Sequence, residues 1–219
     1  MGKVISEKLF EQLREHVKKH LATAPGCHDM DHTMRVYNNA LTIYEMEHDG
    51  DIQVIRTGAL LHDIARPEEM LSEGGLCHAM VGAESAEKIL KDFGVGDEEF
   101  ISRVAEVVRK HRYRDECHPQ TIEEKIVYDA DKLDSIGAVG VGRAFHFAGR
   151  IRARLHNTRE EALNSSEYSV NDSAYREYLV KLREVPVRML TASGRKLAEE
   201  RAQFMHDFFD RLNYEVYGF

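Results

Sequence analysis

The segment Gly58–Arg66, GALLHDIAR, places a histidine and an aspartate, His62 and Asp63, next to each other in an otherwise apolar stretch. Its apolar residues would cover nearly every face of a helix, which predicts a helix buried in a core. Burying an unpaired ionised group costs roughly several kcal/mol, so a buried carboxylate is ion-paired or bound to a metal. Imidazole and carboxylate together suit a divalent transition metal. A core histidine beside a hydrogen-bonded aspartate explains the dipeptide equally well, so further ligands must decide.

The rest of the chain favours one helical domain. Its 219 residues can bury one sizeable core, and no composition shift or linker divides them. Four prolines, no tryptophan and 31% charged residues are typical of a helical protein rather than a β-sandwich. No region alternates apolar and polar residues convincingly enough to be a strand. We therefore expect an all-α fold in a single domain that covers residues 1–219.

Charge and hydropathy exclude several classes of function. Thirty basic against thirty-eight acidic residues give a net charge of −8, which disfavours binding to duplex nucleic acid. The net charge does not exclude a small anionic substrate that is held by a metal. No apolar run approaches the length of a membrane span, and the N-terminus lacks the apolar core of a signal peptide. We therefore expect a cytoplasmic protein that does not contact a membrane, and an oligomer is compatible with the sequence.

Three cysteines, Cys27, Cys77 and Cys117, are each followed directly by a histidine. Their odd number, wide spacing and lack of a CxxC motif indicate neither a disulfide framework nor a zinc ribbon. The sequence offers no physical reason for the repeated Cys-His pair.

Apolar residues at helical spacing, together with cap and breaker residues, predict the helices in order. We expect them at about 6–22, 28–46, 51–65, 78–93, 97–110, around 129–134, 173–184 and 191–214. The last helix is expected to bury Leu197, Phe204, Phe208 and Leu212. The segment 66–77 contains Pro67, Gly74 and Gly75, which predicts a mobile loop that can act as a lid.

The chain turns basic around residue 149. The basic residues of this region are Arg143, His146, Arg150, Arg152, Arg154, His156 and Arg159. One interpretation is a solvated helix face followed by a long polar loop. The other is a flank that binds phosphate.

Two further residues of the right chemistry accompany the His62–Asp63 pair: His32 at the head of one helix and Asp131 in a later apolar helix. Asp29 stands three residues before His32, close enough to orient its imidazole. This H…HD…D order, with the HD inside LLHDIA and the last Asp inside DADKLD, resembles the HD-domain superfamily of metal-dependent phosphohydrolases. The segments HDMDHTMRV, GALLHDIAR, HAMVGAESA and DADKLDSIGAVGVGRAF look most like the small stand-alone bacterial HD hydrolases, several of which are associated with nucleotide hydrolysis.

The resemblance implies an HD-domain helical bundle, with the core of the site between about 28 and 147 and C-terminal helices from about 150 to 219. It also makes His32, His62, Asp63 and Asp131 the ligands of one divalent metal, which is Mn, Fe, Co, Ni, Zn or Mg. Two imidazoles and two carboxylates leave positions open for water and substrate. Such a metal lowers the pKa of a bound water and polarises a phosphoryl oxygen, so that hydroxide attacks phosphorus in line.

Two more histidines, His78 and His111, lie between the HD pair and the last aspartate. Some HD proteins use two histidines in these places to hold a second metal, which Asp63 would then bridge. The alternatives are that both histidines contact substrate phosphate or that both cap helices. All three interpretations stay open at the level of the sequence.

Other residues complete the site that the resemblance implies. Some HD hydrolases carry a catalytic Glu and Asp just after the HD pair, where Glu68 is the nearest acid in this chain. Lys132 is a candidate for a catalytic phosphate contact, and Asp134 is a candidate for orienting a ligand. Arg35 and Arg143 are candidates for substrate binding. Arg35 is alternatively the ion-pair partner of a nearby aspartate.

The expected function is that of a metal-dependent phosphohydrolase. It would cleave a small phosphate ester or anhydride, with a nucleotide as the leading candidate, by attack of metal-activated water. A full H…HD…H…H…D set also occurs in HD-fold proteins that hold two irons and activate oxygen, so a di-iron oxygenase is the alternative. A degenerate HD fold that acts as a binding module is a second alternative, which the intact ligand set disfavours.

Overall fold

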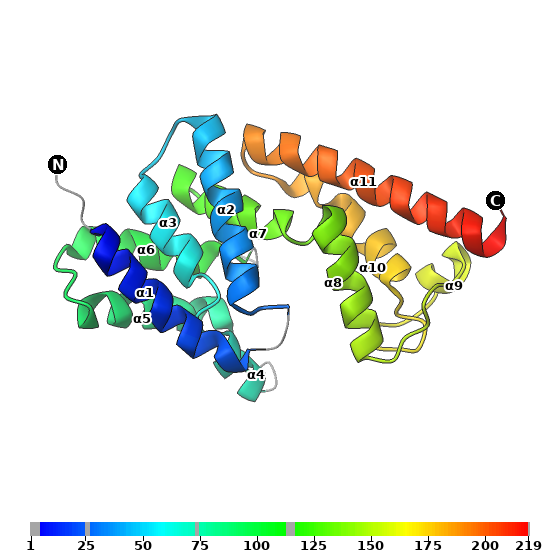
Figure 1. Ribbon diagram of the computed structural model, residues 1–219, viewed down its shortest axis with the longest axis horizontal. Coiled ribbons are helices and arrows are strands. Elements are labelled where there is room, and N and C mark those ends of the chain that lie inside the picture. Colours follow the sequence, from blue (N-terminus) through cyan, green and yellow to red (C-terminus); the bar gives the residue numbers. More distant parts are fainter. Residues whose placement is uncertain (1–4, 25–26, 73–74, 113–116, 219) are drawn as a thin grey trace. The chain divides into compact units, whose positions relative to one another are not determined.

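The computed structural model describes residues 5–24, 27–72, 75–112 and 117–218 (Figure 1). Within those ranges the regular structure is helical and no strand occurs, so the prediction of an all-α fold is confirmed. The chain divides into two compact units, Met1–Asp131 and Lys132–Phe219. This division does not test whether the units fold together, and the single domain stays a prediction.

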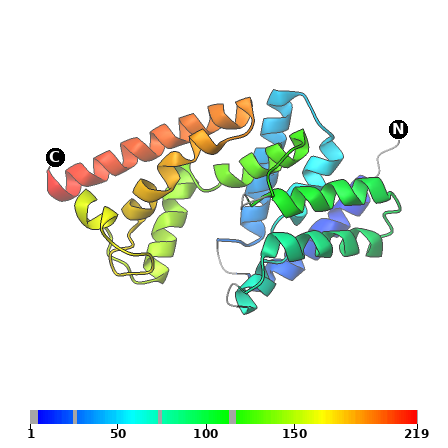
Figure 2. The same cartoon turned by 180° about the vertical axis from the view of Figure 1, so that it is seen from behind.

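The first unit is built from packed helices. In chain order its described elements are α1 (Glu7–His20), the short 3-10 helix η1 (Leu21–Thr23), α2 (Met30–Glu47), α3 (Ile52–Leu61), α4 (Arg66–Leu71), α5 (His78–Asp92), α6 (Glu98–Lys110) and α7 (Ile122–Leu133). Helix α7 ends two residues past the boundary of the unit. Helices α5 and α6 lie side by side in both views, and α2 packs against α3 (Figures 1 and 2).

Short polar side chains start several of these helices. Ser6, Asp29, Asp51 and Asp97 each accept a hydrogen bond from a backbone N–H two or three residues later, at 2.8–3.2 Å. Such a bond satisfies a donor that the start of a helix leaves unpaired, and it is worth about 1 kcal/mol. The helix starts expected at Ser6, Asp51 and Asp97 therefore agree with the structure to within one residue.

Helix α3 ends earlier than the sequence predicts. It stops at Leu61, and His62 and Asp63 lie in the turn that follows it. The expectation of a continuous helix from 51 to 65 is therefore wrong for its last turn. The pair stands at the C-terminal end of a helix, where the helix dipole favours a cation.

A glycine brings α3 close to α6. A Cβ on Gly58 would lie 2.5 Å from Cγ1 of Val107, so only the missing side chain allows this approach. Gly58 stands four residues before His62, and Val107 stands four residues before His111. The contact therefore draws together two helix ends that each carry a buried histidine.

The segment after the HD pair is not a loop throughout. Residues Arg66–Leu71 form α4, with Pro67 and two glutamates in its first turn. Proline suits this position because its missing N–H would be unpaired there anyway, and acidic side chains favour the start of a helix. The predicted loop is therefore wrong for the first half of 66–77. Gly74, on which that prediction partly rested, lies outside the described residues.

The second unit contains the rest of the helices. Its described elements are α8 (Gly137–Arg150), α9 (Arg159–Leu163), α10 (Ala174–Val180), the 3-10 helices η2 (Leu182–Glu184) and η3 (Pro186–Arg188), and α11 (Ala192–Tyr217). The helix expected at 173–184 is thus divided into α10 and η2. None of the helices described in either unit is long and apolar enough to cross a membrane.

The core of the second unit is formed by a different face of α11 than expected. Met205 and Phe209 are fully buried, whereas Phe204 is 48% exposed and Phe208 is half-buried. The ring of Phe209 stacks on that of Tyr178, with centroids 4.6 Å apart. The prediction that Phe204 and Phe208 lie in the core is therefore wrong. The residue after each of them, Met205 and Phe209, is buried instead.

The basic region is mostly exposed. Arg150, Arg152, Arg154 and Arg159 all face solvent, and Nη1 of Arg154 lies 3.0 Å from a carboxylate oxygen of Glu161. These features favour a solvated face over a flank that binds phosphate.

Candidate metal centre

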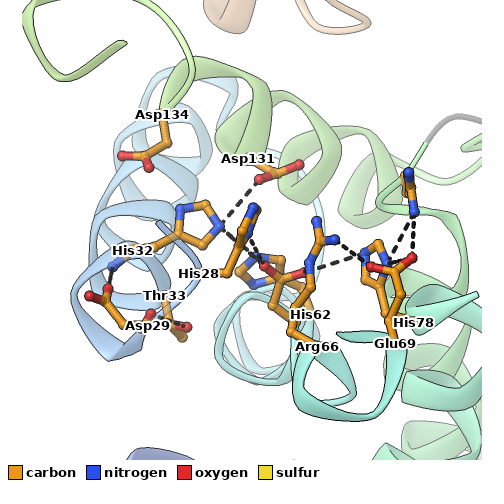
Figure 3. Close-up of polar contacts among 12 residues, drawn as sticks. His28, Asp29, His32, Thr33, His62, Arg66, Glu69, His78, Asp131 and Asp134 are labelled. Atoms are coloured by element: carbon orange, nitrogen blue, oxygen red, sulfur yellow. Dashed lines mark hydrogen bonds and ion pairs between the residues drawn. The ribbon is translucent and has the colours of Figure 1, made fainter. Parts of the chain in front are cut away.

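Four side chains from three segments of the first unit come together, and Figure 3 shows three of them, His32, His62 and Asp131. Nε2 of His32 lies 3.3 Å from Nε2 of His62, 3.4 Å from Oδ2 of Asp63 and 3.5 Å from Oδ1 of Asp131. Nε2 of His62 lies 3.7 Å from the same oxygen of Asp63. The structure therefore brings together the four residues that the sequence suggested as ligands.

A second group of nitrogens faces the other oxygen of the same aspartate. Nε2 of His78 and Nε2 of His111 lie 3.4 and 3.5 Å from Oδ1 of Asp63, and 3.1 Å from each other. The carboxylate of Asp63 thus lies between two histidine groups, with Oδ2 facing one and Oδ1 facing the other.

Each of these residues stands near the end of a helix. His32 lies in the first turn of α2, His62 and Asp63 directly after α3, His78 at the first position of α5, His111 directly after α6, and Asp131 in the last turn of α7. The expected role of Asp29 needs correction. Its carboxylate accepts a hydrogen bond from the backbone N–H of His32, at 3.0 Å, and caps α2 rather than orienting the imidazole.

Backbone carbonyls fix the orientation of two imidazoles. Nδ1 of His62 lies 2.8 Å from the carbonyl oxygen of Ala59, and Nδ1 of His111 lies 2.6 Å from that of Val108. A carbonyl only accepts hydrogen bonds, so each Nδ1 carries a proton and donates it. In a neutral imidazole this leaves a lone pair on Nε2, which faces the group around Asp63.

The spacing of the donor atoms fits a metal ion. Nitrogen and oxygen ligands bound at about 2.1 Å, at angles between octahedral and tetrahedral, lie about 3.0–3.4 Å from one another. The distances given above between donor atoms of the two groups range from 3.1 to 3.7 Å. Two imidazoles with two carboxylate oxygens in one group, and two imidazoles with one in the other, are donor sets typical of divalent transition metals.

The site is buried, yet its central carboxylate is ionised. His32, His62 and His78 have no exposed surface, and Asp63 is 2% exposed. Burial alone would raise the pKa of Asp63, but at the low pH where this carboxyl titrates the surrounding imidazoles are protonated, and the charge of His62 and hydrogen bonds from the neighbouring rings outweigh burial and hold that pKa well below its usual range. The carboxylate therefore stays ionised, as a metal ligand must be.

Burial acts in the opposite direction on the histidines. It lowers the pKa of His62 to about 4 and that of His78 to about 3, and the neighbouring His111 lowers both further. Both imidazoles are therefore neutral at pH 7 and keep a lone pair for a metal.

These pKa values give a test on the metal-free protein. We expect the ¹⁵N chemical shifts of His62 to show a neutral ring with its proton on Nδ1 at pH 5.5, where an imidazole with a pKa near 6.5 is mostly charged. Because the pKa is lowered in the folded state, the stabilisation from the neutral ring is complete above pH 6.5 and is lost as the pH falls toward 4. A charged His62 ring at pH 5.5 would contradict this assignment.

One imidazole of the site was not singled out from the sequence. Nδ1 of His28 lies 2.9 Å from Oδ2 of Asp63, and its side chain is 28% exposed. Together with His32 and Asp63 it forms a further group whose ligand atoms lie within 4.8 Å of one another. The only signal in the sequence was the repeated Cys-His pair, since His28 and His78 each follow a cysteine.

The acid that reaches the site is Glu69 rather than Glu68. A carboxylate oxygen of Glu68 lies 3.1 Å from Nε2 of His20, at the end of α1, so the structure does not bring the suggested catalytic acid into the site. Glu69 lies one residue further along α4, and its Oε1 is 3.0 Å from Nδ1 of His78.

The remaining candidates lie outside the two groups. Asp134 is buried, and its carboxylate pairs at 2.5 Å with Nη1 of Arg143, within the second unit. The roles predicted for Asp134 in orienting a ligand and for Arg143 in binding substrate stay predictions. Lys132 lies in the last turn of α7, and Arg35 lies on α2 one turn after His32. Their contacts with substrate stay predictions.

Comparisons with known proteins show the family of this chain. The sequence model of the HD domain family matches residues 29–136, a range that contains both histidine groups but not His28. The chain is 34% identical to the YpgQ protein of Bacillus subtilis over 218 residues, which cover 96% of this chain and 95% of that protein.

Solved structures lead to the same group of proteins. The crystal structure of Bacillus subtilis YpgQ superposes with a TM-score of 0.74 at 32% identity, covering 96% of this chain and 97% of that one. A crystal structure of YpgQ in complex with ADP gives a TM-score of 0.72, with 96% of each chain covered at 32% identity. The crystal structure of a predicted HD superfamily hydrolase from an uncultured Thermotogales bacterium superposes with a TM-score of 0.68 at 30% identity. The match covers 94% of this chain and 92% of that one.

Proposed function

The chain belongs to the HD domain family, and from this premise we propose that it is a metal-dependent phosphohydrolase acting on a small phosphorylated substrate, with a nucleotide as the leading candidate. Its similarity to HD superfamily hydrolases supports a metal-dependent hydrolase in general. The observation that carries the finer proposal is the buried carboxylate of Asp63, whose two oxygens face two separate histidine groups.

We assign one divalent ion to His32, His62, Asp63 and Asp131, whose donor atoms lie near one another pair by pair. We assign a second to Asp63, His78 and His111. When bound, such ions supply a water of lowered pKa and polarise a phosphoryl oxygen. The protein holds the ligands in place: the backbone fixes the imidazoles of His62 and His111 before any ion arrives.

The other residues of the site bind substrate and limit access by water. Asp131 and His28 are partly exposed, so the substrate reaches the site on their side. The ring of His28 donates its Nδ1–H to Asp63 and lines this side of the site. The fully buried His62 and His78 keep bulk water away from the opposite side.

Two observations support a nucleotide. YpgQ, which matches this chain over nearly its whole length, has been crystallised with ADP. The net charge of −8 disfavours a long polyanion but not a small anionic ligand concentrated at a metal site.

The test combines each of several metals with each of several candidate substrates. The protein is stripped of metal, reloaded separately with Mn²⁺, Fe²⁺, Co²⁺, Ni²⁺, Zn²⁺ or Mg²⁺, and incubated with nucleoside mono-, di- and triphosphates. Assays that separate phosphate from pyrophosphate identify the bond that is cleaved. We expect turnover only after reloading, and the proposal fails if metal-loaded protein hydrolyses none of these compounds.

The group formed by Asp63, His78 and His111 also keeps a di-iron oxygenase as a second candidate, because two adjacent ion positions suit dioxygen activation as well. Reloading with Fe²⁺ and measuring oxygen consumption distinguishes the two activities. Oxygen uptake coupled to loss of an organic substrate, without release of phosphate, would favour the oxygenase.

A further inference from the structure

Two arginines beside the metal centre share one carboxylate. Nη1 of Arg66 lies 2.6 Å from Oε2 of Glu69, and Nη1 of Arg112 lies 2.9 Å from Oε1 of the same side chain. The side chains are 19%, 27% and 15% exposed, respectively for Arg66, Arg112 and Glu69. Glu69 therefore bridges two guanidinium groups that are partly shielded from solvent.

This bridge is joined to the centre on the side of its second histidine group. Nε of Arg66 donates to Oδ1 of Asp63 at 3.0 Å, and Nη1 of Arg112 lies 3.2 Å from Nδ1 of His78 (Figure 3 shows Arg66, Glu69 and His78). Both arginines are thus held at the edge of the site and not on a distant surface.

The arrangement leaves hydrogen-bond donors to spare. The two guanidinium groups are balanced in charge by the carboxylates of Glu69 and Asp63. Nη2 of Arg66, and Nε and Nη2 of Arg112, make no hydrogen bond to any residue that the structure describes. Guanidinium groups bind phosphate through pairs of parallel N–H bonds, and a fixed pair loses little entropy when a phosphate binds.

We propose that Arg66 and Arg112, held by Glu69, form an anion subsite that binds a second phosphate group of the substrate, next to the phosphate that lies at the metal centre. This rests on the proposed phosphohydrolase function and narrows its substrates to compounds with at least two linked phosphates. Glu69 is then a positioning residue, because it touches the arginines rather than the substrate.

The test compares ligands that differ by one phosphate. Affinities for AMP and for a methylene-bridged analogue of ADP, whose phosphates cannot be separated by hydrolysis, are measured by calorimetry on Mn²⁺-loaded protein. We expect Arg112→Gln to weaken binding of the ADP analogue about tenfold or more and that of AMP less than about twofold, because only the analogue carries the second phosphate. Equal weakening of both ligands, or no weakening of the analogue, would overturn the subsite.

Arg109→Gln is the matched control. Arg109 lies on the same stretch of chain, is 23% exposed and pairs with Glu106 instead of Glu69. This variant should bind both ligands as the wild type does. A loss of affinity for the analogue as large as in Arg112→Gln would mean that net charge, not the subsite, sets the affinity.

A double variant tests the role of Glu69. Glu69→Gln should also weaken binding of the ADP analogue, and combining it with Arg112→Gln should add less than the sum of the single effects, because both act on one bridge. Full additivity would contradict the bridge. Bound Mn²⁺ per chain, measured for each variant, separates loss of the subsite from loss of the metal.

These binding measurements do not depend on turnover. A protein that discriminates the two ligands through Arg112 but hydrolyses no phosphate compound would refute the proposed function and leave the subsite standing. A protein that hydrolyses phosphate compounds but binds both ligands equally in all variants would refute the subsite alone.

Discussion

Asp63→Asn should remove bound metal and turnover together. Asp63 is shared by both histidine groups, so its loss weakens both ion positions at once. Replacing an outer partner of a metal ligand costs about 10–100-fold in affinity or activity, and the loss of a shared ligand should exceed about 100-fold in kcat/KM. Metal content is measured by mass spectrometry on the purified protein, and kcat/KM on whichever nucleotide the substrate panel identifies.

The folded state should also lose stability in Asp63→Asn, because asparagine keeps only one of the two oxygens that accept from His28 and Arg66, and its NH₂ group leaves the other donor without an acceptor. Leaving such groups unsatisfied costs about 1–3 kcal/mol, which thermal unfolding of the metal-free protein can detect. A variant that kept full metal content would show that Asp63 is not a ligand.

Asp172→Asn is the control for the general cost of removing a buried carboxylate. Asp172 is 5% exposed and pairs with Arg176 at 3.0 Å, within the second unit. We expect this variant to lose stability but to keep its metal and its activity. If it lost metal as well, the effect of Asp63→Asn would reflect misfolding rather than ligation.

His78→Ala and His111→Ala should each lower the metal content from two ions per chain to one. Their Nε2 atoms lie 3.1 Å apart and face the same oxygen of Asp63, so removing either leaves too few ligands for the second ion. The first group remains complete in both variants. Turnover should fall with the loss of the ion, because two adjacent ions stabilise both the attacking and the leaving oxygen.

The other outcomes of this experiment distinguish the alternative roles of the two histidines. Unchanged metal content with a raised KM would assign His78 and His111 to substrate phosphate instead, and unchanged metal and activity would make them structural. His156→Ala is the matched control, because this imidazole is 7% exposed and burial lowers its pKa, yet it lies in the second unit. Two ions should remain in that variant.

Much of the fold is predictable because its signals are local. The helix starts follow from Ser6, Asp51 and Asp97, which cap their own helices. The convergence of His32, His62, Asp63 and Asp131 was inferable because acids and imidazoles in apolar helices need a common partner. Whether these residues bind a metal stays a prediction until the ion is measured.

The errors have physical causes too. Successive residues on a helix differ by about 100° in direction, so choosing Glu68 over Glu69 places the carboxylate on another face. On α11 the adjacent Phe208 and Phe209 offer two apolar faces, and only tertiary packing against Tyr178 selects one of them. The hydrogen bond from His28 to Asp63 spans 35 residues, and the repeated Cys-His pair marks His28 without indicating this partner.

The carbonyl oxygens of Ala59 and Val108 fix their imidazoles from within the same helices that carry them. Fixed imidazole nitrogens beside carboxylate oxygens suit several divalent transition metals, so the donor set alone does not select one of them. Occupancy then follows the supply of metals and their general order of affinity. The ion found in a purified sample will therefore reflect the medium in which the cells grew, and only samples stripped and reloaded with single metals can identify the ion that supports activity.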